Sequence, residues 1–199
     1  MHWRTLQKPI LQLGREKSFR NLNIPLSFPL YWVIHSIGPC DVTKKDDLEK
    51  VVAAISRKEK YINLLVTAAG ISGPKVEPDS QKASELKEKL FNNESFQQWS
   101  DTFNTNVSSV YFTTVAFLPL LQAGKESHGH LSASVIVISS MSGIMRDAQG
   151  HFSYNAAKGA TVHLSKLMSY EFKKAGIRVN SIAPGYFPSE VITVPIRGK

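Results

Sequence analysis

Cysteine is almost absent from this sequence of 199 residues, in which Cys40 is the single one. One cysteine cannot form a disulfide within the chain, and scarce cysteine is typical of proteins in a reducing compartment. We therefore expect a cytoplasmic location. Metal-ligating clusters are scarce too. His128 and His130 stand close together, but no cysteine or further histidine lies near them, so a solvated loop is a better interpretation than a metal site.

The sequence also has few long apolar runs and few acidic residues. The apolar stretch at residues 25–37 includes Pro29 and His35 and is shorter than the roughly 20 residues that span a bilayer, so we expect no membrane partner. The net charge is +8, and residues 1–36 carry half of it with five basic residues and one acidic residue. The other basic residues are scattered and form no stripe with aromatic residues, which argues against a nucleic-acid partner.

Regular periodicity is missing from the first 36 residues, where Pro9, Pro25 and Pro29 would interrupt any helix. A transit peptide is also basic and poor in acids, but this segment has few serines. We leave residues 1–37 unassigned. The length then favours one domain, at residues 38–199.

From residue 41 onward, helix and strand periods alternate. Thr43 and Asp46 match a capping box that would open the first helix. Buried strands are expected at residues 62–66, 135–139 and 177–182, and helices at 97–121 and 153–174, with stops at Gly124 and Gly176. The polar stretch 72–94 is expected to be a surface excursion with one helical piece at 81–91.

This alternation predicts an α/β fold with a doubly wound parallel sheet and right-handed crossovers. In open sheets of this kind, ligands bind beyond the carboxyl ends of the strands. The segments expected there are Thr67–Gly70, Ser139–Ser140 and Pro184–Ser189.

Three of the residues near these strand ends form a chemical pattern. Tyr154 follows Ser140 by fourteen residues, and Lys158 follows Tyr154 by four, so tyrosine and lysine share one helix face. A phenol has a pKa of about 10, and an ammonium one turn away lowers that pKa by roughly 1–3 units, toward the range of a general acid/base. Taken alone, Tyr-x-x-x-Lys fits a half-buried ring beside a solvated lysine better, so the surrounding motifs decide the interpretation.

Six short motifs stand in order along the chain: CDVT (40–43), TAAG (67–70), NTNV (104–107), VISS (137–140), YNAAK (154–158) and NSIAPG (180–185). With these motifs, residues 38–189 resemble the short-chain dehydrogenase/reductases, especially 3-oxoacyl reductases. The resemblance implies a Rossmann-like fold and an NAD(P)H-dependent oxidoreductase of secondary metabolism. Such an enzyme reduces a ketone or 3-oxoacyl group to a secondary alcohol, or runs the reverse reaction.

The resemblance also implies roles for particular residues. Tyr154 would be the general acid/base, Lys158 would lower its pKa and bind the nicotinamide ribose, and Ser140 would hold the substrate oxygen. Asn106 would support a proton-relay water near the lysine. Asp41 would reach the adenine, and the backbone of Ala69 and Gly70 would approach the adenosine ribose. The residues implied at the nicotinamide carboxamide are Pro184, Gly185 and Ser189.

The same resemblance implies a cofactor and partners. NADP is expected because reductases of this type commonly use it, and NAD stays open. The expected partners are a small carbonyl or alcohol substrate and further copies of the chain, bound through helices 97–121 and 153–174. His151 and Tyr186 would border the substrate. Simpler interpretations stay open for Gly70, Pro184 and Gly185 as turn formers, for Asp41 ahead of a helix, and for Asn106 as a local backbone partner.

The sequence departs from the family in one large respect. No two glycines stand at i and i+2, so the glycine-rich turn that cradles the pyrophosphate is missing, and with it the first βαβ unit and the usual discriminator between NAD and NADP. The sheet is therefore expected to be incomplete, with strand 62–66 as an exposed apolar edge. Thr67 and Ala68 replace paired asparagines, and the Ser140–Tyr154 interval is one residue longer than usual. These departures favour an alternative, a non-catalytic remnant that binds cofactor weakly or associates with an intact subunit.

Overall fold

The computed structural model describes residues 11–12, 39–127 and 133–186. Its sheet consists of parallel strands in the order β1-β2-β3-β4. In register, Val135 of β3 lies beside Leu65 of β2 on one side and Val179 of β4 on the other. The strands are β1 (Leu11–Gln12), β2 (Leu64–Thr67), β3 (Ala133–Ile138) and β4 (Ile177–Ile182).

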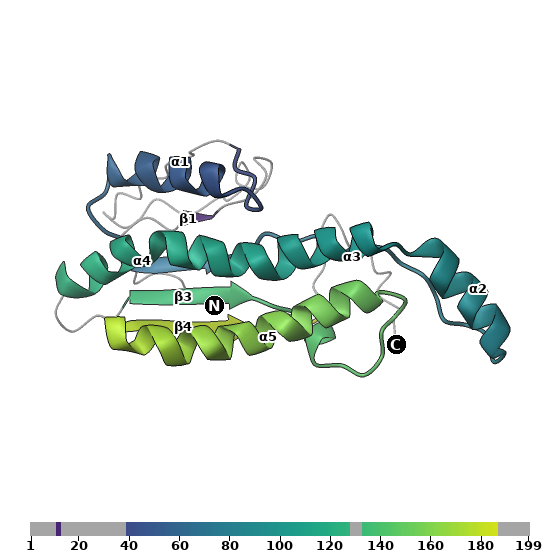
Figure 1. Cartoon of the computed structure of the whole chain (residues 1–199). Coiled ribbons are helices and arrows are strands. Elements are labelled where there is room, and N and C mark those ends of the chain that lie inside the picture. The colour runs from purple at the N-terminus through teal and green to yellow at the C-terminus, as the bar shows by residue number, and fades with distance from the viewer. Residues whose placement is uncertain (1–10, 13–38, 128–132, 187–199) are drawn as a thin grey trace, which may run out of the picture.

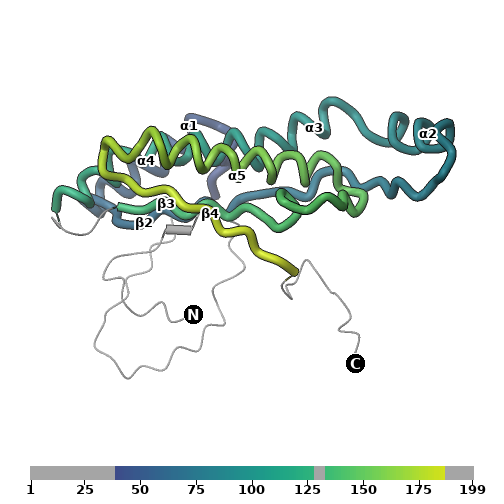
Figure 2. Tube along the Cα trace, turned by 90° about the horizontal axis from the view of Figure 1, so that it is seen from below, coloured from purple at the N-terminus to yellow at the C-terminus, as the bar shows by residue number. Residues whose placement is uncertain are grey.

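Three helices cover one face of this sheet, as Figures 1 and 2 show: α1 (Lys45–Ser56), α4 (Ser109–Ser127) and α5 (Phe152–Phe172). Burial alternates along β3 accordingly, since Ala133, Val135 and Val137 are buried and the residues between them are partly exposed. Parallel strands need such crossover helices, so the predicted α/β class, incomplete as expected, is confirmed.

The core lies between α4 and the sheet. Phe117 and Leu121 of α4 are fully buried, and they belong to one apolar cluster with Leu65, Val135 and residues of the other strands. Each such side chain stabilises the fold by about 1.5–3 kcal/mol relative to an exposed position. This burial places the carboxyl ends of β2 and β3 next to the start of α5.

The edge of β2 differs from the prediction. β1, from the segment left unassigned, pairs with β2 at Leu11–Leu65 and Gln12–Val66. The edge expected to be exposed is therefore covered over these two residue pairs, because another part of the chain supplies backbone partners. Two residues have no periodicity, so no pattern in the sequence could reveal this strand.

The predicted capping box at Thr43 is wrong. The N-cap of α1 is Lys44, whose side chain makes no capping bond, so Thr43 lies one residue too early to cap the helix. Instead, the Thr43 Oγ1 donates to Asp41 Oδ1 at 2.6 Å, and the same carboxylate accepts from the Thr43 backbone N–H, which forms an Asx turn. A true capping box opens α3 (Phe96–Phe103), where Ser95 and Gln98 bond each other's backbone N–H.

The helix predicted at 97–121 is longer and is interrupted. α3 passes through a π-helical turn, η1 (Asn104–Ser108), into α4, which ends at Ser127. Within the described ranges, Phe96–Ser127 is the helix long and apolar enough to cross a membrane by length and composition. Its residues Val110, Phe117, Leu120 and Leu121 are buried in the core. Gly124 is no stop: a Cβ there would lie 2.2 Å from the Ile62 carbonyl oxygen.

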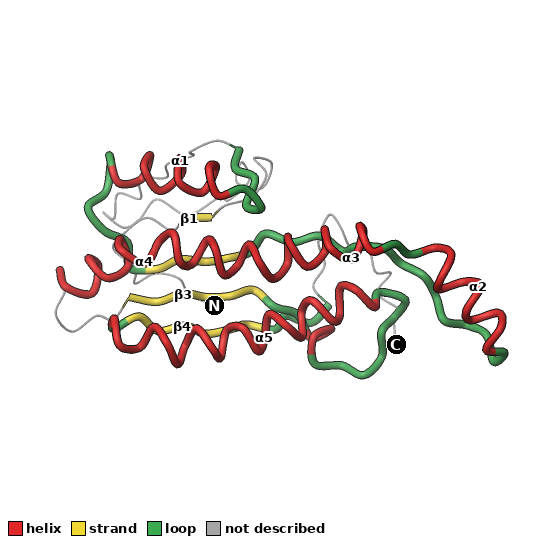
Figure 3. The backbone as a smooth tube through the Cα atoms, viewed as in Figure 1, coloured by secondary structure: helices red, strands yellow, loops and turns green. Residues whose placement is uncertain are grey.

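The polar excursion has the predicted form. Its helix, α2 (Ala83–Asn93), has no buried residue and projects beyond the carboxyl ends of the strands (Figures 1 and 3). Two small 3₁₀ turns complete the described elements, η2 (Met141–Gly143) after β3 and η3 (Lys173–Ala175) after α5.

The contact at Gly124 gives a test of the packing between α4 and the segment before β2. We expect Gly124→Ala to lower the free energy of unfolding by about 1–3 kcal/mol, because backbone must move to admit the methyl group. Helix propensity alone favours alanine by about 1 kcal/mol, so a loss of stability reports the clash. Urea denaturation measures it, with exposed Gln122→Ala as control, and a stabilised Gly124→Ala would contradict the contact.

Candidate active site

Lys158 lies at the centre of the candidate site, in the second turn of α5. Its side chain is only 6% exposed, and its Nζ donates to the carbonyl oxygen of Ile138, the last residue of β3, at 3.0 Å. Burial lowers the pKa of this lysine, because the charged form loses hydration. An ammonium is thus held at the carboxyl end of a central strand, where the sequence predicted ligands.

Tyr154 lies one turn earlier on the same face. The Lys158 Nζ is 5.7 Å from the centre of the Tyr154 ring, and the His151 ring meets the tyrosine edge-on with centroids 6.4 Å apart. The tyrosine is half-buried. The Tyr154 ring and the Lys158 ammonium therefore lie close together, as predicted. The alternative interpretation, a solvated lysine, does not hold because Lys158 is buried.

Ser140 follows β3 in extended backbone and precedes η2. Its Oγ accepts from the Ser142 N–H at 3.1 Å, which leaves its own hydroxyl proton for another acceptor. The turn is pressed against α5: a Cβ on Gly143 would lie 2.6 Å from the Lys158 carbonyl oxygen. Ser139 Oγ also donates to that oxygen, at 3.2 Å. These contacts hold the serine segment and the Tyr154–Lys158 helix together.

Asn106 closes the site from η1. It is fully buried, and its side chain bonds both backbone groups of Ile71 at 2.8 Å: Oδ1 accepts from the N–H and Nδ2 donates to the carbonyl. A Cβ on Gly70 would lie 2.9 Å from Asn106 Oδ1 and 3.7 Å from Lys158 Nζ. The loop after β2, the π-turn and the lysine therefore meet at Gly70, where no side chain fits easily.

These bonds refine the role expected for Asn106. Ile71 uses the Oδ1 acceptor and one N–H of Nδ2, and the amide keeps its second N–H. The backbone carbonyl of Asn106 accepts from the Thr161 hydroxyl at 2.8 Å and keeps a second lone pair, and the Lys158 ammonium keeps two of its three N–H groups. A relay water near the lysine therefore has this carbonyl and the lysine N–H groups available as partners.

Asp41 lies on another side of the site. Its carboxylate bonds Thr43 and forms an ion pair with Lys44 at 3.2 Å, and the threonine bonds are the main cause that lowers its pKa. It borders a cavity of about 490 Å³ between the start of α1 and the α3–η1–α4 helix, which includes Thr105, the neighbour of Asn106. A cavity of this size suits a small-molecule fragment such as a purine. Ser140, Tyr154 and Lys158 do not line it.

The segment after β4 returns to the serine turn. The Pro184 carbonyl accepts from the Met141 N–H at 2.9 Å, and a Cβ on Gly185 would lie 3.3 Å from the Met141 sulfur. Pro184 and Gly185 are thus brought to Ser140, as predicted for residues around one ligand. Ser189 lies outside the described residues, as do His128 and His130.

Two features of the site escaped the sequence analysis. Tyr186 Oη donates to Gln149 Oε1 at 2.5 Å, and Gln149 has a φ of 51°, which leads into Gly150 at 73°. Thr161 was also missed, although its spacing of three from Lys158 and seven from Tyr154 places it on the same helix face.

Proteins of similar sequence and structure identify the family of this chain. A sequence model described as short chain dehydrogenase matches residues 35–194. The chain belongs to that family. In the described residues there is no group of three or more side chains that could hold a metal ion.

Curated relatives include two fungal proteins and a bacterial one. Short-chain dehydrogenase/reductase SAT3 of Stachybotrys chartarum is 36% identical over 170 residues, which are 78% of this chain and 63% of that protein. PhomF of Diaporthe leptostromiformis is 40% identical over 155 residues, with 76% and 52% covered. The 3-oxoacyl-(acyl-carrier-protein) reductase FabG of Chlamydia trachomatis is 30% identical over 157 residues, with 78% and 54% covered. The chain spans about half to three-fifths of the length of these short-chain dehydrogenases.

Solved structures show the same fold. The NADP complex of Pseudomonas aeruginosa RhlG has a TM-score of 0.63 and 27% identity, and the match covers 77% of this chain and 54% of that one. The NADPH-bound carbonyl reductase from chicken fatty liver has a TM-score of 0.60 at 24% identity, with 76% and 57% covered, which supports the fold alone. The predicted family and Rossmann-like architecture are confirmed.

The buried lysine gives a pH-dependent prediction. Because burial lowers the pKa of Lys158 in the folded chain, the penalty is fully present at neutral pH and fades as the pH rises toward the unfolded value of about 10.4. We expect Lys158→Met to unfold at higher urea concentration than the wild type at pH 7, with the difference shrinking toward pH 10. Exposed Lys166→Met should show neither effect. A Lys158→Met protein that is less stable at every pH would refute the burial penalty.

Proposed function

We propose that this short-chain dehydrogenase is an NADP-dependent oxidoreductase that reduces a ketone or 3-oxoacyl group to a secondary alcohol, or catalyses the reverse. The observation that carries the proposal is the buried Lys158 ammonium beside Tyr154, at the end of β3. A fixed positive charge beside the proton donor stabilises the negative charge that develops on the donor oxygen while its proton is transferred. Burial of a charged side chain lowers the stability of the fold, and a lysine with a purely structural role would not require that loss.

Each residue then has a step to perform. Tyr154 donates its proton to the substrate oxygen in reduction and takes it back in oxidation. Ser140 holds the same oxygen with the hydroxyl proton that its bond to Ser142 leaves unused. Lys158 stabilises the phenolate and bonds the ribose of the cofactor, and the Asn106 carbonyl helps to hold a water that returns the proton. The nicotinamide supplies or accepts the hydride when it is bound.

The fit of the chain to a dinucleotide is uneven. Because Gly70 has no side chain, the loop after β2 can lie close to Asn106 and Lys158, and the cavity at Asp41 has room for an adenine. NADP is the cofactor proposed, supported by the RhlG complex; NAD is the second cofactor that the assay compares. Against this, no Gly-x-Gly pair is available for the pyrophosphate.

That missing turn supports a second candidate, a non-catalytic remnant that binds cofactor weakly or associates with an intact subunit. Measurements of cofactor binding and of substrate turnover distinguish the two candidates. Tryptophan fluorescence and equilibrium dialysis, each with NADPH and with NADH, measure binding, and loss of NADPH or NADH absorbance with a panel of ketones and 3-oxoacyl thioesters measures turnover. Binding without turnover favours the remnant.

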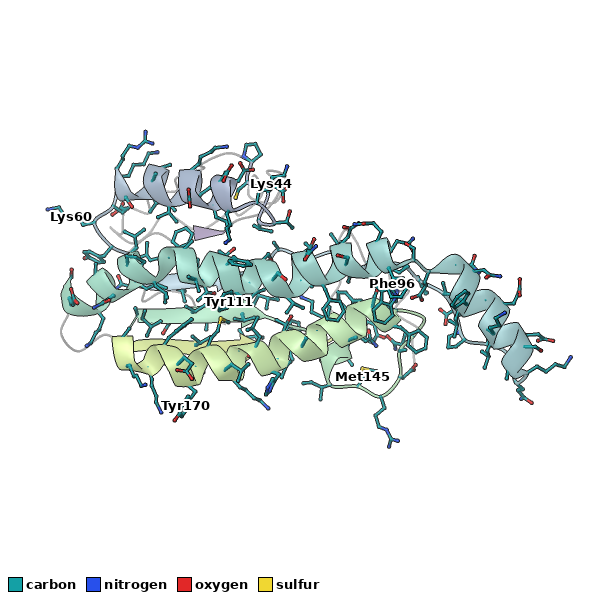
Figure 4. The ribbon with its side chains drawn as sticks, viewed as in Figure 1. Lys44, Lys60, Phe96, Tyr111, Met145 and Tyr170 are labelled. Atoms are coloured by element: carbon teal, nitrogen blue, oxygen red, sulfur yellow. The ribbon has the colours of Figure 1, made fainter. Side chains whose placement is uncertain are left out.

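We also propose that the chain works in the cytoplasm as a homo-oligomer that uses the helices at 97–121 and 153–174. Large apolar side chains are exposed on both, including Tyr111 of α4 and Leu167 and Tyr170 of α5, and Figure 4 shows Tyr170 on the outer side of its helix. Sedimentation velocity measures the mass. A single species of monomer mass at micromolar concentration would exclude this assembly.

The catalytic proposal is tested by Tyr154→Phe. Loss of the proton donor is expected to lower kcat by about 10²–10⁴-fold, because general acid catalysis contributes this much, while NADPH binding stays within a factor of a few. Tyr170→Phe, on the exposed side of α5, is the matched control and should keep the wild-type rate. Equal rates for Tyr154→Phe and the wild type would refute the assignment of the tyrosine.

A further inference from the structure

Thr161 is a fully buried hydroxyl on the catalytic face of α5. Its Oγ1 lies 2.8 Å from the carbonyl oxygen of Asn106, on another helix, and 2.9 Å from that of Ala157, one turn back on its own helix. A hydroxyl has one proton and can donate fully to one acceptor at a time. The shorter contact is the one that crosses between helices.

The acceptor of this bond sits where the helix is least regular. Asn106 is in the middle of η1, and a π-helical turn widens the helix and shifts its carbonyls away from their usual partners. Such turns are costly unless a neighbour satisfies the displaced group. Thr161 supplies that donor from the side, and both residues are fully buried.

Asn106 in turn holds the Gly70–Ile71 loop, which lies beside Lys158. Its side chain fixes both backbone groups of Ile71 and so the position of Gly70, which is next to the Lys158 ammonium. The hydroxyl of Thr161, the π-turn and the loop after β2 therefore form one hydrogen-bonded series. It joins the helix that carries Tyr154 and Lys158 to the loop expected at the cofactor ribose.

We propose that Thr161 is a positioning residue: its bond to the Asn106 carbonyl fixes the π-turn and, through Asn106, the Gly70–Ile71 loop relative to Lys158. The consequence for catalysis rests on the proposed oxidoreductase function. The consequence for the loop does not, because it follows from the bonds alone.

A competing interpretation assigns Thr161 an ordinary bond to its own helix. Thr114 provides the comparison, since it is equally buried and donates to the Val110 carbonyl at 2.7 Å, four residues back on α4. If the bond to Ala157 were the important one, replacing either threonine by valine would have similar local effects and would leave the π-turn and the loop unchanged.

The experiment compares Thr161→Val, Thr161→Ser and Thr114→Val by amide hydrogen exchange with mass spectrometry on the full chain. Valine keeps the volume and removes the hydroxyl, and serine keeps the hydroxyl. Loss of one hydrogen bond predicts exchange on the order of 5- to 10-fold faster in Thr161→Val for peptides that cover residues 68–73 and 104–111. Thr161→Ser should restore the wild-type rate there, and Thr114→Val should leave residues 68–73 unchanged. Should Thr161→Val fail to fold, Thr161→Ala takes its place in the same comparison.

Kinetics add a second readout if the wild-type chain turns over a ketone. Thr161→Val should then lower kcat about 10-fold by the same reasoning, with Thr161→Ser near the wild type and Thr114→Val unchanged. A wild-type chain without turnover refutes the proposed function and leaves the exchange result to decide on Thr161. Exchange at residues 68–73 that is equal in Thr161→Val and the wild type would overturn the positioning role.

Discussion

The candidate site is built around one buried charge. The Lys158 ammonium is almost fully removed from water, and the described residues give it a single close oxygen, the carbonyl of Ile138. Taking a charge out of water is costly unless it is paired or hydrogen-bonded. The lysine can stay there because the end of β3 points a carbonyl at it, and because the ammonium retains two N–H groups that a bound ligand or water can use. Burial of this charge lowers the stability of the fold, a cost that is common at functional sites.

Close backbone contacts around this lysine explain much of the local sequence. Gly143 lets the serine turn touch the carbonyl of Lys158 itself, and Gly70 lets the loop after β2 reach Asn106. Any side chain at either position would push apart elements that together hold Ser140, Tyr154 and Lys158. The site is thus assembled from the ends of β2 and β3, the π-turn η1 and the first turns of α5, and the apolar core beneath α4 keeps these pieces in register.

Sequence reasoning succeeded where a period or a spacing repeats. Tyr154 and Lys158 were placed on one face by their separation, and β3 and β4 by their apolar residues. It failed where a competing contact decides the outcome. Thr43 does not cap α1 because it lies in a local turn with Asp41 and the helix starts one residue later, after Lys44. Gly124 does not end α4; it makes a close contact with Ile62, which a helical pattern cannot show because it depends on where another segment lies.

The sequence by itself determined the family, the alternation of strands and helices, and the residue types of the candidate catalytic set, because these follow from side-chain periodicity and from motifs in a given order. Only the tertiary structure decided that β1 covers the edge of β2, that the helix widens at Asn106, and that Thr161 and Ile71 are the partners of that asparagine. The physical reason is that a hydrogen bond between distant segments has no period along the chain. It depends on which polar groups the packing of the core leaves buried and in need of a partner.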